Sequence, residues 1–423
     1  MPANDYVTRV LNAPQALSAA EWNGLLALEP DPSPFMRHEY LAALHQSGSA
    51  VDATGWQAQF ITLWRGDTLH AACPMYLKNH SHGEYVFDWA WASAYERHGL
   101  SYYPKALVAV PFTPVPGARL LARDAQARAA LVRALVRQAQ DEHLSSLHLL
   151  FAQAQDVAAC QAAGLMLRHS VQFHWQNMAP TLPAVLGSLP PEGARFPLGR
   201  PGGEAAFCDF DHFLASLQQD KRKKIRQERR KVADAGVVFR SVQGPAITEA
   251  DWDFFYRCYE RTYLEHGNAP YLNRDFFKCM AQDMPEHWLL FVAERDGRPM
   301  ASSLIGIDEG HGVAYGRYWG ALERVDCLHF EACYYQPLDW CIAHGFQRFE
   351  GGAQGEHKMA RALLPVKTTS AHWLAHPSFA DAVERYLNTE GKGIHRYLEQ
   401  LSHRNPLKRP PPDQPERLPH NRL

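Results

Sequence analysis

The sequence predicts an α/β (α+β) fold made of two tandem halves, each a mixed sheet flanked by helices. An apolar strand–turn–strand pattern occurs twice, at 59–77 and at 288–308. In both halves a helical stretch then leads directly into a short apolar strand. A segment rich in proline and glycine separates the two copies at 180–206. Because the copies share the order of their elements rather than their residues, two unrelated α/β domains are the alternative.

The first half contains three clear elements. A helical pattern from Phe35 to Gln46 ends at Ser47-Gly48-Ser49, and a short helical candidate precedes it at 18–28. Residues 84–115 are aromatic and interrupted by prolines, a composition that predicts short strands and shaped loops. The helix expected at 124–142 carries leucines and alanines on one stripe, and a buried strand follows it at 147–151.

The second half adds a third strand at 312–319 and a helix at 328–345 with Pro337 in its interior. Proline removes a hydrogen-bond donor and clashes with the preceding turn, so this helix should kink or have a shortened first part. A strand at 348–350 follows the helix directly. A closing helix is expected at 378–401, where the glycines at 391 and 393 could break it.

These patterns divide the chain into five expected segments. They are an N-terminal extension at 1–34, a first domain at 35–180, a linker or long loop at 181–206, a second domain at 207–403 that includes a basic helix at 220–235, and a disordered polar tail at 404–423.

The composition and the short motifs exclude several classes of protein. No apolar stretch reaches the roughly 18 residues of a membrane-spanning helix. The N-terminus lacks the basic start and apolar run of a secretory signal, so we expect a cytoplasmic protein. Eight scattered cysteines without a C-x-x-C pair predict free thiols. The absence of a P-loop, of G-x-G-x-x-G after a strand and of G-x-S-x-G argues against a kinase, a dehydrogenase or an α/β-hydrolase.

The segment 349–358 has the greatest density of chemically active side chains. A strand ends there in a glycine-rich turn, and ligands of open α/β sheets bind beyond the carboxyl ends of strands. Glu350, Glu356 or His357 could accept a proton from an attacking amine, while backbone N–H groups of the turn could stabilise an oxyanion. Lys358 or Arg361 could bind an anionic group. The alternative is an ordinary loop whose charges face water.

A metal site at this segment is a weaker interpretation. His329, Glu331, Glu356 and His357 could supply nitrogen and oxygen ligands. His329 and Glu331, however, are two positions apart on a helix and therefore point to different faces. We predict no metal.

Aromatic residues interleaved with charges form a second group at 83–114. Glu84, Asp88, Tyr103 and Lys105 stand among them and would suit a groove for an extended, partly apolar substrate. The alternative is a packed core whose polar residues mark turns, and this fits Phe87, Trp89 and Phe112 better.

The basic helix forms a third group, with eight basic and two acidic residues between positions 220 and 231. In a nearly neutral protein of net charge −2, such a helix should attract phosphates of RNA, a nucleotide or a lipid head group. The alternative is a merely solvated helix. The expected phosphate contacts are Lys221, Arg222, Lys224, Arg226 and Arg230.

At these residues the sequence resembles the FemAB-like family of peptidoglycan biosynthesis/recognition proteins, which is grouped with the GNAT acyltransferases. The similar segments occur in the same order as in the family, at 72–78, 80–89, 102–105, 110–114, 221–231, 329–331, 333–335 and 352–358.

The resemblance implies two tandem GNAT-like domains and transfer of an acyl or aminoacyl group to an amine, for instance that of a peptidoglycan-related precursor. It adds His329, Glu331 and Gln354 to the expected substrate contacts. The acyl donor, acyl-CoA or aminoacyl-tRNA, would be a co-substrate rather than a permanently bound cofactor, and tRNA would suit the basic helix. Residues 322–326 lack the pyrophosphate-binding loop of ordinary GNAT enzymes, so the donor stays open. The alternative is a non-catalytic protein that binds a cell-wall precursor or another anionic ligand.

Overall fold

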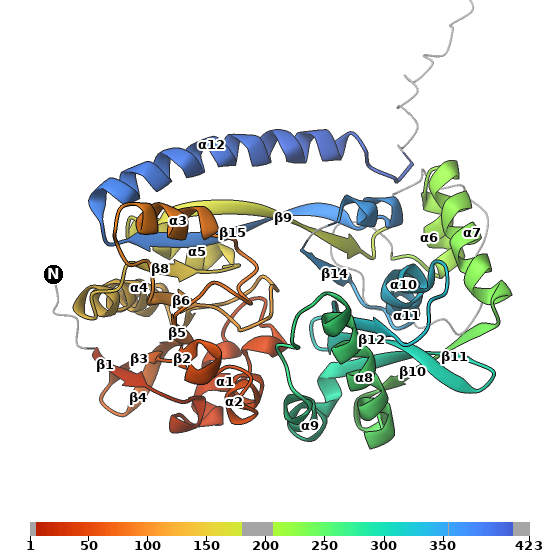
Figure 1. The fold of residues 1–423 in the computed structure, drawn as a ribbon, viewed down its shortest axis with the longest axis horizontal. Coiled ribbons are helices and arrows are strands. Elements are labelled where there is room, and N and C mark those ends of the chain that lie inside the picture. Colours follow the sequence, from red (N-terminus) through yellow and green to blue (C-terminus); the bar gives the residue numbers. More distant parts are fainter. Residues whose placement is uncertain (1–5, 180–205, 354, 409–423) are drawn as a thin grey trace, which may run out of the picture.

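The computed structural model describes residues 6–179, 206–353 and 355–408. Their strands form two sheets, one of four strands in the order β1-β3-β4-β7 and one of eleven in the order β10-β11-β12-β13-β14-β9-β15-β8-β6-β5-β2. The large sheet runs through the whole molecule, and helices pack on its faces (Figure 1). The predicted mixed α/β class is confirmed.

The first half contributes nine strands and five helices of the described residues. Its strands are β1 (Val7–Leu11), β2 (Trp56–Ala58), β3 (Phe60–Arg65), β4 (Thr68–Cys73), β5 (Met75–Lys78), β6 (Lys105–Val108), β7 (Leu121–Ala122), β8 (Ser146–Leu149) and β9 (Met166–Gln176). Its helices are α1 (Ala19–Leu26), α2 (His38–Gln46), α3 (Trp89–Arg97), α4 (Ala125–Asp141) and α5 (Ala154–Ala162).

The second half contributes six strands and seven helices of the described residues. The strands are β10 (Val237–Gln243), β11 (Trp288–Arg295), β12 (Arg298–Asp308), β13 (Val313–Ala321), β14 (Arg348–Ala353) and β15 (Leu364–Leu374). The helices are α6 (Phe210–Ser216), α7 (Gln219–Asp234), α8 (Glu249–Glu265), α9 (Arg274–Asp283), α10 (Leu328–Phe330), α11 (Gln336–Ala343) and α12 (Pro377–Ser402).

The two halves share an order of elements. In the first, β6 pairs in parallel with β8 after the helix α4. In the second, β13 pairs in parallel with β14 after α10 and α11. In both, all other pairs of neighbouring strands within the half are antiparallel among the described residues. The parallel pair therefore marks the equivalent place in each half.

The last strand of each half reaches toward the other half. β9 lies between β14 and β15, and β15 lies between β9 and β8, so strands of the two halves alternate in the middle of the sheet. Figure 1 shows β9 and β15 as long strands under α12, which extends across both halves. Residues of both halves therefore meet on one continuous sheet at β14 and β9.

Most predicted elements are confirmed, and two expectations were wrong. The glycines at 391 and 393 do not break the closing helix, because α12 is continuous from Pro377 to Ser402. Residues 84–115 include the helix α3 among their loops, and its buried Trp91 and Tyr95 lie four positions apart on one face. Pro337 has the expected effect, since the five residues Glu331–Tyr335 before α11 form a π-helix, η6.

The expected extension and tail take part in the fold where they are described. β1 pairs with β3, and Trp22 is fully buried. Leu407 forms a bridge to Leu217. The expected linker at 181–206 and most of the tail lie outside the described residues. Among helices of residues 6–179, 206–353 and 355–408, none has both the length and the apolar character needed to cross a membrane.

Candidate functional site

The parallel pair β13–β14 opens after three residues. Pairing runs from Val313 opposite Arg348 to Tyr315 opposite Glu350, and then β13 continues alone with β12. At the point of separation β13 has one extra residue, because Gly316 and Tyr318 lie opposite consecutive residues of β12 and Arg317 has no partner there. Such a bulge disrupts the ladder and re-aims side chains, and bulges are frequent beside active sites.

A pocket of about 150 Å³ lies where the two strands separate. Its walls come from four elements: Ser303 and Ile305 of β12, residues 316–319 of β13, His329, Cys333 and Tyr334 of the helical segment, and Phe349 and Gly351 of β14. A side chain at Gly351 would collide with Leu363 and the carbonyl of Phe173, so glycine permits the close packing of β14 at this point. The pocket therefore combines backbone, aromatic and imidazole groups.

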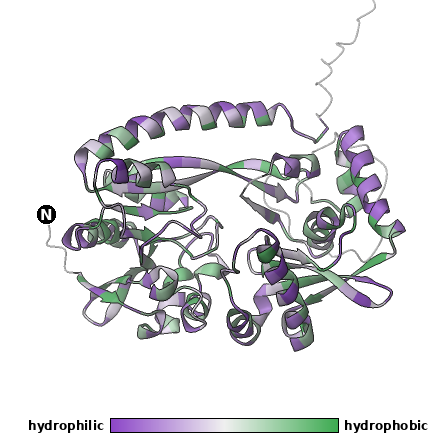
Figure 2. Cartoon of the chain, viewed as in Figure 1, coloured by the Kyte–Doolittle hydropathy of each residue, from purple (hydrophilic) through white to green (hydrophobic). Residues whose placement is uncertain are grey.

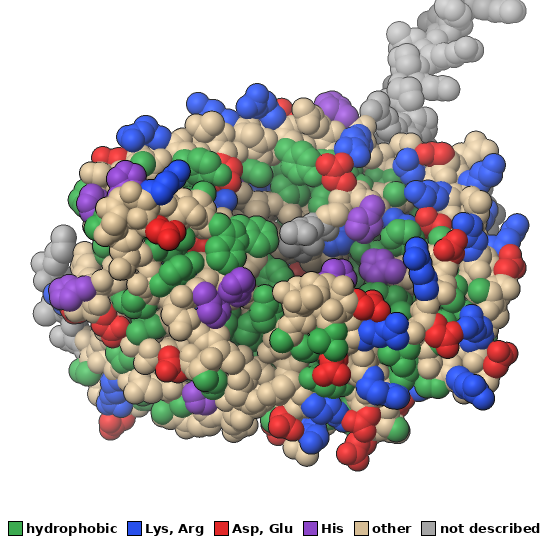
Figure 3. Space-filling view, viewed as in Figure 1, with side chains coloured by type: hydrophobic (Ala, Val, Ile, Leu, Met, Phe, Trp, Pro, Cys, Tyr) green, Lys and Arg blue, Asp and Glu red, His purple; other side chains and the backbone are tan. Residues whose placement is uncertain are grey.

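Tyrosine and histidine side chains meet on the helical side of β14. The Nε2 atom of His357 lies 3.3 Å from the hydroxyl oxygen of Tyr334, which lines the pocket from the π-helix η6. Desolvation and the nearby cations Arg361 and Lys358 lower the pKa of His357. The imidazole is therefore neutral at neutral pH, and because burial raises the pKa of Tyr334, the two side chains form a contact between neutral groups. Figure 3 shows several histidine side chains near the middle of the face of the molecule that it displays.

A carboxyl group lies on the opposite side of β14, facing the first half. The side chain of Glu350 is buried, its Oε1 atom is 3.0 Å from Nε of Arg348, and its Oε2 atom has no hydrogen-bond partner among the described residues. His174 of β9 is its partner across the sheet, with Nε2 4.0 Å from Oε2. Burial raises the pKa of Glu350 to about 7, although Arg348 opposes the shift. Glu350 can therefore hold or release a proton near neutral pH.

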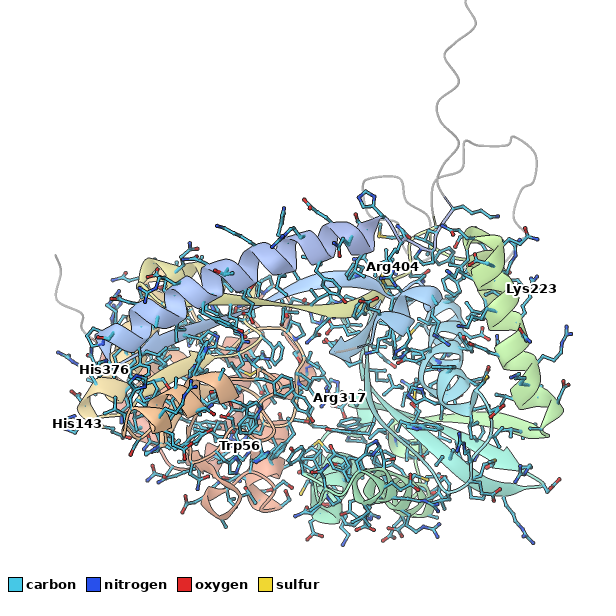
Figure 4. The ribbon with its side chains drawn as sticks, turned by 45° about the horizontal axis from the view of Figure 1, so that its top comes forward. Trp56, His143, Lys223, Arg317, His376 and Arg404 are labelled. Carbon is cyan, nitrogen blue, oxygen red and sulfur yellow. The ribbon has the colours of Figure 1, made fainter. Side chains whose placement is uncertain are left out.

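Glu350 lies on the same side of the sheet as its β13 partner Tyr315, whose ring packs against Phe35. Arg317 also lies beside Phe35, between the two halves (Figure 4). Its Nη2 atom donates to the carbonyl of Phe112 and to the hydroxyl of Tyr318, both at 3.1 Å. The bulge places Arg317 and Tyr318 on one face, where both reach the apolar core that contains Phe35.

The remaining predicted residues of this segment hold the turn together. Glu356 is exposed and accepts hydrogen bonds from Tyr397 at 2.9 Å and from Arg404 at 2.7 Å. Lys358 is buried, donates to the carbonyls of Gly351 and Gly352, and has its pKa lowered by burial to about 8. Gln354 lies outside the described residues.

Two further predicted residues anchor the basic helix α7. Arg361 donates to Glu228 of α7 at 2.8 Å, and its guanidinium lies 3.7 Å from the ring centroid of Phe330. Glu331 accepts from Arg229 of α7 at 3.1 Å. The basic helix is thus joined to the turn after β14 by the buried pair Arg361–Glu228, and to the π-helix η6 by the half-buried pair Arg229–Glu331.

The outer face of α7 is strongly basic. Figure 2 colours this helix as mainly hydrophilic, and Figure 3 shows Lys and Arg side chains gathered over it. Residues three or four apart on one side line a groove of about 660 Å³: Gln219, Arg222, Lys223, Arg226, Gln227 and Arg230. Of the expected phosphate contacts, Lys221 and Arg226 also pair with Asp220 and Asp211, and Lys224 lies 4.0 Å from Glu228.

The predicted residues of the first half form a separate buried cluster around Lys105. The Nζ atom of Lys105 donates to Ser81 and Glu84, both at 2.8 Å, and to Asp88. Burial alone would lower the pKa of Lys105, but the two carboxylates hold it above its ordinary value. Burial raises the pKa of Glu84 to about 7. Tyr103 contacts the same Ser81, with 2.8 Å between the two hydroxyl oxygens.

This cluster continues into the second half through two histidines. Tyr102 donates to Asp88 at 2.6 Å, so its oxygen accepts from Nε2 of His148 at 3.1 Å. Nδ1 of His148 then accepts from Nδ1 of His372 on β15, at 2.7 Å. Burial lowers the pKa of both imidazoles, that of His372 to about 3, so both are neutral.

The structure therefore separates the residues predicted from the sequence into distinct places. In the sheet, β6 is four strands from β14, a separation of roughly 19 Å at the usual strand spacing. Glu350 and His357 lie on opposite sides of β14, and Glu356 faces the end of α12. His329 lines the pocket beside Trp319.

Sequence reasoning missed His174, Arg317 and Tyr334. His174 had a readable signal, because polar and apolar residues alternate from Ser170 to Gln176 as in a half-buried strand. Tyr334 lies four residues after Phe330, on one helical face. The bulge at Arg317 left no readable pattern. Among the described residues no three His, Cys, Asp or Glu side chains are grouped as a metal site would require.

Comparison with known proteins identifies the family of the chain. The model of the FemAB-like family, described as peptidoglycan biosynthesis/recognition, matches residues 13–181 and 203–409. No curated protein matches the sequence.

Solved structures resemble this chain over most of its length. The crystal structure of FemX is 10% identical, has a TM-score of 0.50, and covers 87% of this chain and 98% of its own. The C-terminal domain of a protein assigned as a lysylphosphatidylglycerol synthetase, from Agrobacterium fabrum, is 10% identical with a TM-score of 0.50, and covers 86% and 96%. At this identity the likeness concerns the fold alone. The mixed α/β fold with a repeated order of elements, expected from the sequence, is confirmed. The chain belongs to the FemAB-like family of peptidoglycan biosynthesis and recognition proteins.

Proposed function

We propose that this protein transfers an acyl or aminoacyl group to an amine, at the place where β13 separates from β14. The observation that carries the proposal is the buried Glu350, whose carboxyl group has one unpartnered oxygen and a pKa of about 7 beside that opening. A general base works best when its pKa lies near the operating pH. Peptidoglycan-related amines are the acceptors we favour, because of the family to which the chain belongs.

The proposed reaction forms one bond and breaks another. The amine nitrogen attacks the carbonyl carbon of the donor, and its proton passes to Glu350. Backbone N–H groups at the bulge and at Gly351 would hold the negative oxygen of the tetrahedral intermediate. Collapse breaks the ester bond of an aminoacyl-tRNA, or the thioester bond of an acyl-CoA. Glu350 then gives its proton to the leaving oxygen or sulfur, which restores the carboxylate, while the pair Tyr334–His357 lies on the pocket side of the opening.

Aminoacyl-tRNA is the donor that the charges favour. Arg222, Lys223 and Arg230 have no ion-pair partner among the described residues, and they share one face of α7. The ion pairs Arg361–Glu228 and Arg229–Glu331 connect this helix to the segments around the pocket. A tRNA phosphate backbone bound on α7 would therefore lie next to segments that are held in place beside the pocket. One structural neighbour is named for making lysylphosphatidylglycerol, which is an aminoacylated product.

A direct assay tests the proposal. The protein is incubated with labelled aminoacyl-tRNAs or acyl-CoAs and with muropeptide amines, and products are sought by mass spectrometry. We expect an amide product from at least one pair that forms only with intact protein. Binding without any product would support the alternative of a recognition protein. Such binding would stabilise the folded protein by roughly 2.7 kcal/mol when the ligand concentration is about 100 times its dissociation constant. The Arg348–Glu350 ion pair favours that alternative, because it occupies one carboxylate oxygen.

Removing charge from α7 should weaken tRNA binding. Replacing Arg222, Arg226 and Arg230 together with glutamine removes three phosphate contacts. The slope of log affinity against log salt concentration should fall by about 2–3, because each phosphate contact releases about one counterion. Fluorescence anisotropy with deacylated tRNA between about 50 and 200 mM salt measures this slope.

A matched variant controls for net charge. It removes three exposed cations from α8 and α9 instead, Arg257, Arg261 and Lys278. This variant should leave the salt slope unchanged. Equal slopes for both triple variants would show that α7 has no special role in binding tRNA.

A further inference from the structure

Buried polar atoms without partners gather where the two halves meet. Among the described residues, Nε of Arg317, Nε of Arg119 and Oε2 of Glu350 are buried and accept or donate no hydrogen bond. The charge of Glu350 acts on Arg119, and Arg317 acts on Glu350, so the three groups share one neighbourhood. Most buried polar atoms in proteins are satisfied, and a cluster of exceptions indicates water or a ligand.

Arg317 is a cation held by neutral groups. Its Nη2 atom donates to the carbonyl of Phe112 and the hydroxyl of Tyr318, with Thr113 Oγ1 further away at 3.4 Å. Its guanidinium lies 5.1 Å from the ring centroid of Phe35. Among the described residues no carboxylate is within 4.0 Å of it, so its charge is not balanced by an ion pair. Arg317 is half-buried and its Nε atom is fully buried, so a charge without a counterion is costly here and an incoming anion would reduce that cost.

The surroundings of Arg317 favour an anion rather than a cation. The carboxylates of this region already have cationic partners, since Glu350 is paired with Arg348, Glu331 with Arg229, and Glu356 with Arg404. Arg317, which lines the pocket, has no such partner among the described residues.

We propose that Arg317 binds a carboxylate of the acceptor, so that the substrate is an amine that also carries a carboxylate group. This inference rests on the proposed function and names its substrate class. A guanidinium presents planar, parallel donors that match a carboxylate. Because Arg317 belongs to the second half and its partners Phe112 and Thr113 to the first, the anion would be held at the junction of both halves. The same junction contains Glu350, so the amine group of an acceptor whose carboxylate is bound by Arg317 would lie close to Glu350.

Small aromatic probes test the site without requiring turnover. Benzoate, phenyl phosphate and neutral benzamide have one ring in common and differ in their polar group. We expect benzoate to bind the full chain at least about tenfold more tightly than benzamide, a difference of about 1.4 kcal/mol. Arg317→Gln should abolish that preference, and Arg317→Lys should retain only part of it because lysine lacks the planar pair of donors. Titration calorimetry or ligand-observed NMR measures each affinity.

Arg257→Gln is the matched control, because Arg257 is an exposed arginine of α8 outside both proposed binding sites. It should bind benzoate as the unchanged protein does. Should Arg317→Gln not fold, Arg317→Lys and Thr113→Val still alter the site and should weaken benzoate binding. Equal binding of benzoate and benzamide, or loss of benzoate binding in Arg257→Gln alone, would overturn the proposal. Phenyl phosphate binding tenfold more tightly than benzoate would overturn the carboxylate assignment.

The outcome is separable from that of the transfer assay. A carboxylate preference that depends on Arg317, in a protein that forms no product, would reject the proposed transfer and keep the anion site. A product formed equally well from amines with and without a carboxylate would keep the transfer and reject this substrate class.

Discussion

Replacing Lys105 with methionine is expected to lower the free energy of unfolding by about 3–5 kcal/mol, because it leaves two buried carboxyl groups without their shared cation. Lys105, Glu84 and Asp88 are all less than 5% exposed. The Nζ atom of Lys105 donates to both carboxylates and to Ser81. A water molecule in its place would supply neither the positive charge nor all three hydrogen bonds. Chemical denaturation monitored by tryptophan fluorescence measures the loss.

The loss of stability in Lys105→Met should become larger as pH rises. Without Lys105, burial keeps the pKa of Glu84 above its ordinary value of 4.5, so the folded chain binds more protons than the unfolded chain. Stability then falls as pH rises. The deficit of the methionine variant should therefore be larger at about pH 8 than at about pH 5.

Two further variants complete this test. Adding Glu84→Gln and Asp88→Asn to Lys105→Met removes the unpaired charges and should restore about 1–2 kcal/mol. Lys223→Met, on the exposed face of α7, should change stability by no more than about 0.5 kcal/mol. A loss of similar size in Lys223→Met, or none in Lys105→Met, would show that the cluster does not stabilise the fold.

The sequence predicted local structure better than long-range pairing. The hairpin of β11 and β12 and the helix α7 were readable because their periodicities and turns lie within a few residues. The pairing of Glu350 with His174 joins residues 176 positions apart in β14 and β9, and no local pattern encodes it. Alternation identifies a strand at 170–176 but not its neighbouring strands, which depend on how the halves pack.

The candidate site shows the same limit. Glu350 was found because it ends a strand before a glycine-rich turn, yet its burial and raised pKa depend on the first half covering it. Arg361 was predicted as a substrate contact from its chemistry and Glu331 from the family resemblance, whereas in the fold both form ion pairs with α7. Which charges pair within the protein and which remain for a ligand is decided by tertiary contacts.

Glu350→Gln should reduce turnover by about 10²–10⁴-fold if Glu350 is the general base. Glutamine keeps the size and a hydrogen-bonding oxygen but cannot accept the amine proton. In the unchanged protein the rate should rise with pH through about 7, because Glu350 must lose its proton before it can act. This rise should be absent in the glutamine variant. The acceptor amine also ionises, but equally for both proteins, so the difference between their profiles isolates Glu350.

Stability provides an independent check on the same group. The pKa of Glu350 is raised from 4.5 to about 7 by burial, so between these values the folded chain keeps a proton that the unfolded chain releases. The unchanged protein should therefore lose stability as pH rises across that window, and Glu350→Gln should remove the share of this slope that Glu350 contributes, while Glu84, whose pKa is also raised to about 7, keeps its own share. If Glu350→Gln loses activity and also this part of the dependence of stability on pH, it has lost the titrating group rather than its fold.

Glu356→Gln is the matched control for the turnover prediction, since it alters an exposed carboxylate in the same segment that pairs with Tyr397 and Arg404. It should change turnover by less than about twofold, because an exposed pair contributes little. If Glu356→Gln lost activity as Glu350→Gln is expected to, the base would lie on the outer side of the turn. If Glu350→Gln kept activity within about fivefold and retained the pH profile, Glu350 would have no part in proton transfer, because a general base contributes at least about 10²-fold.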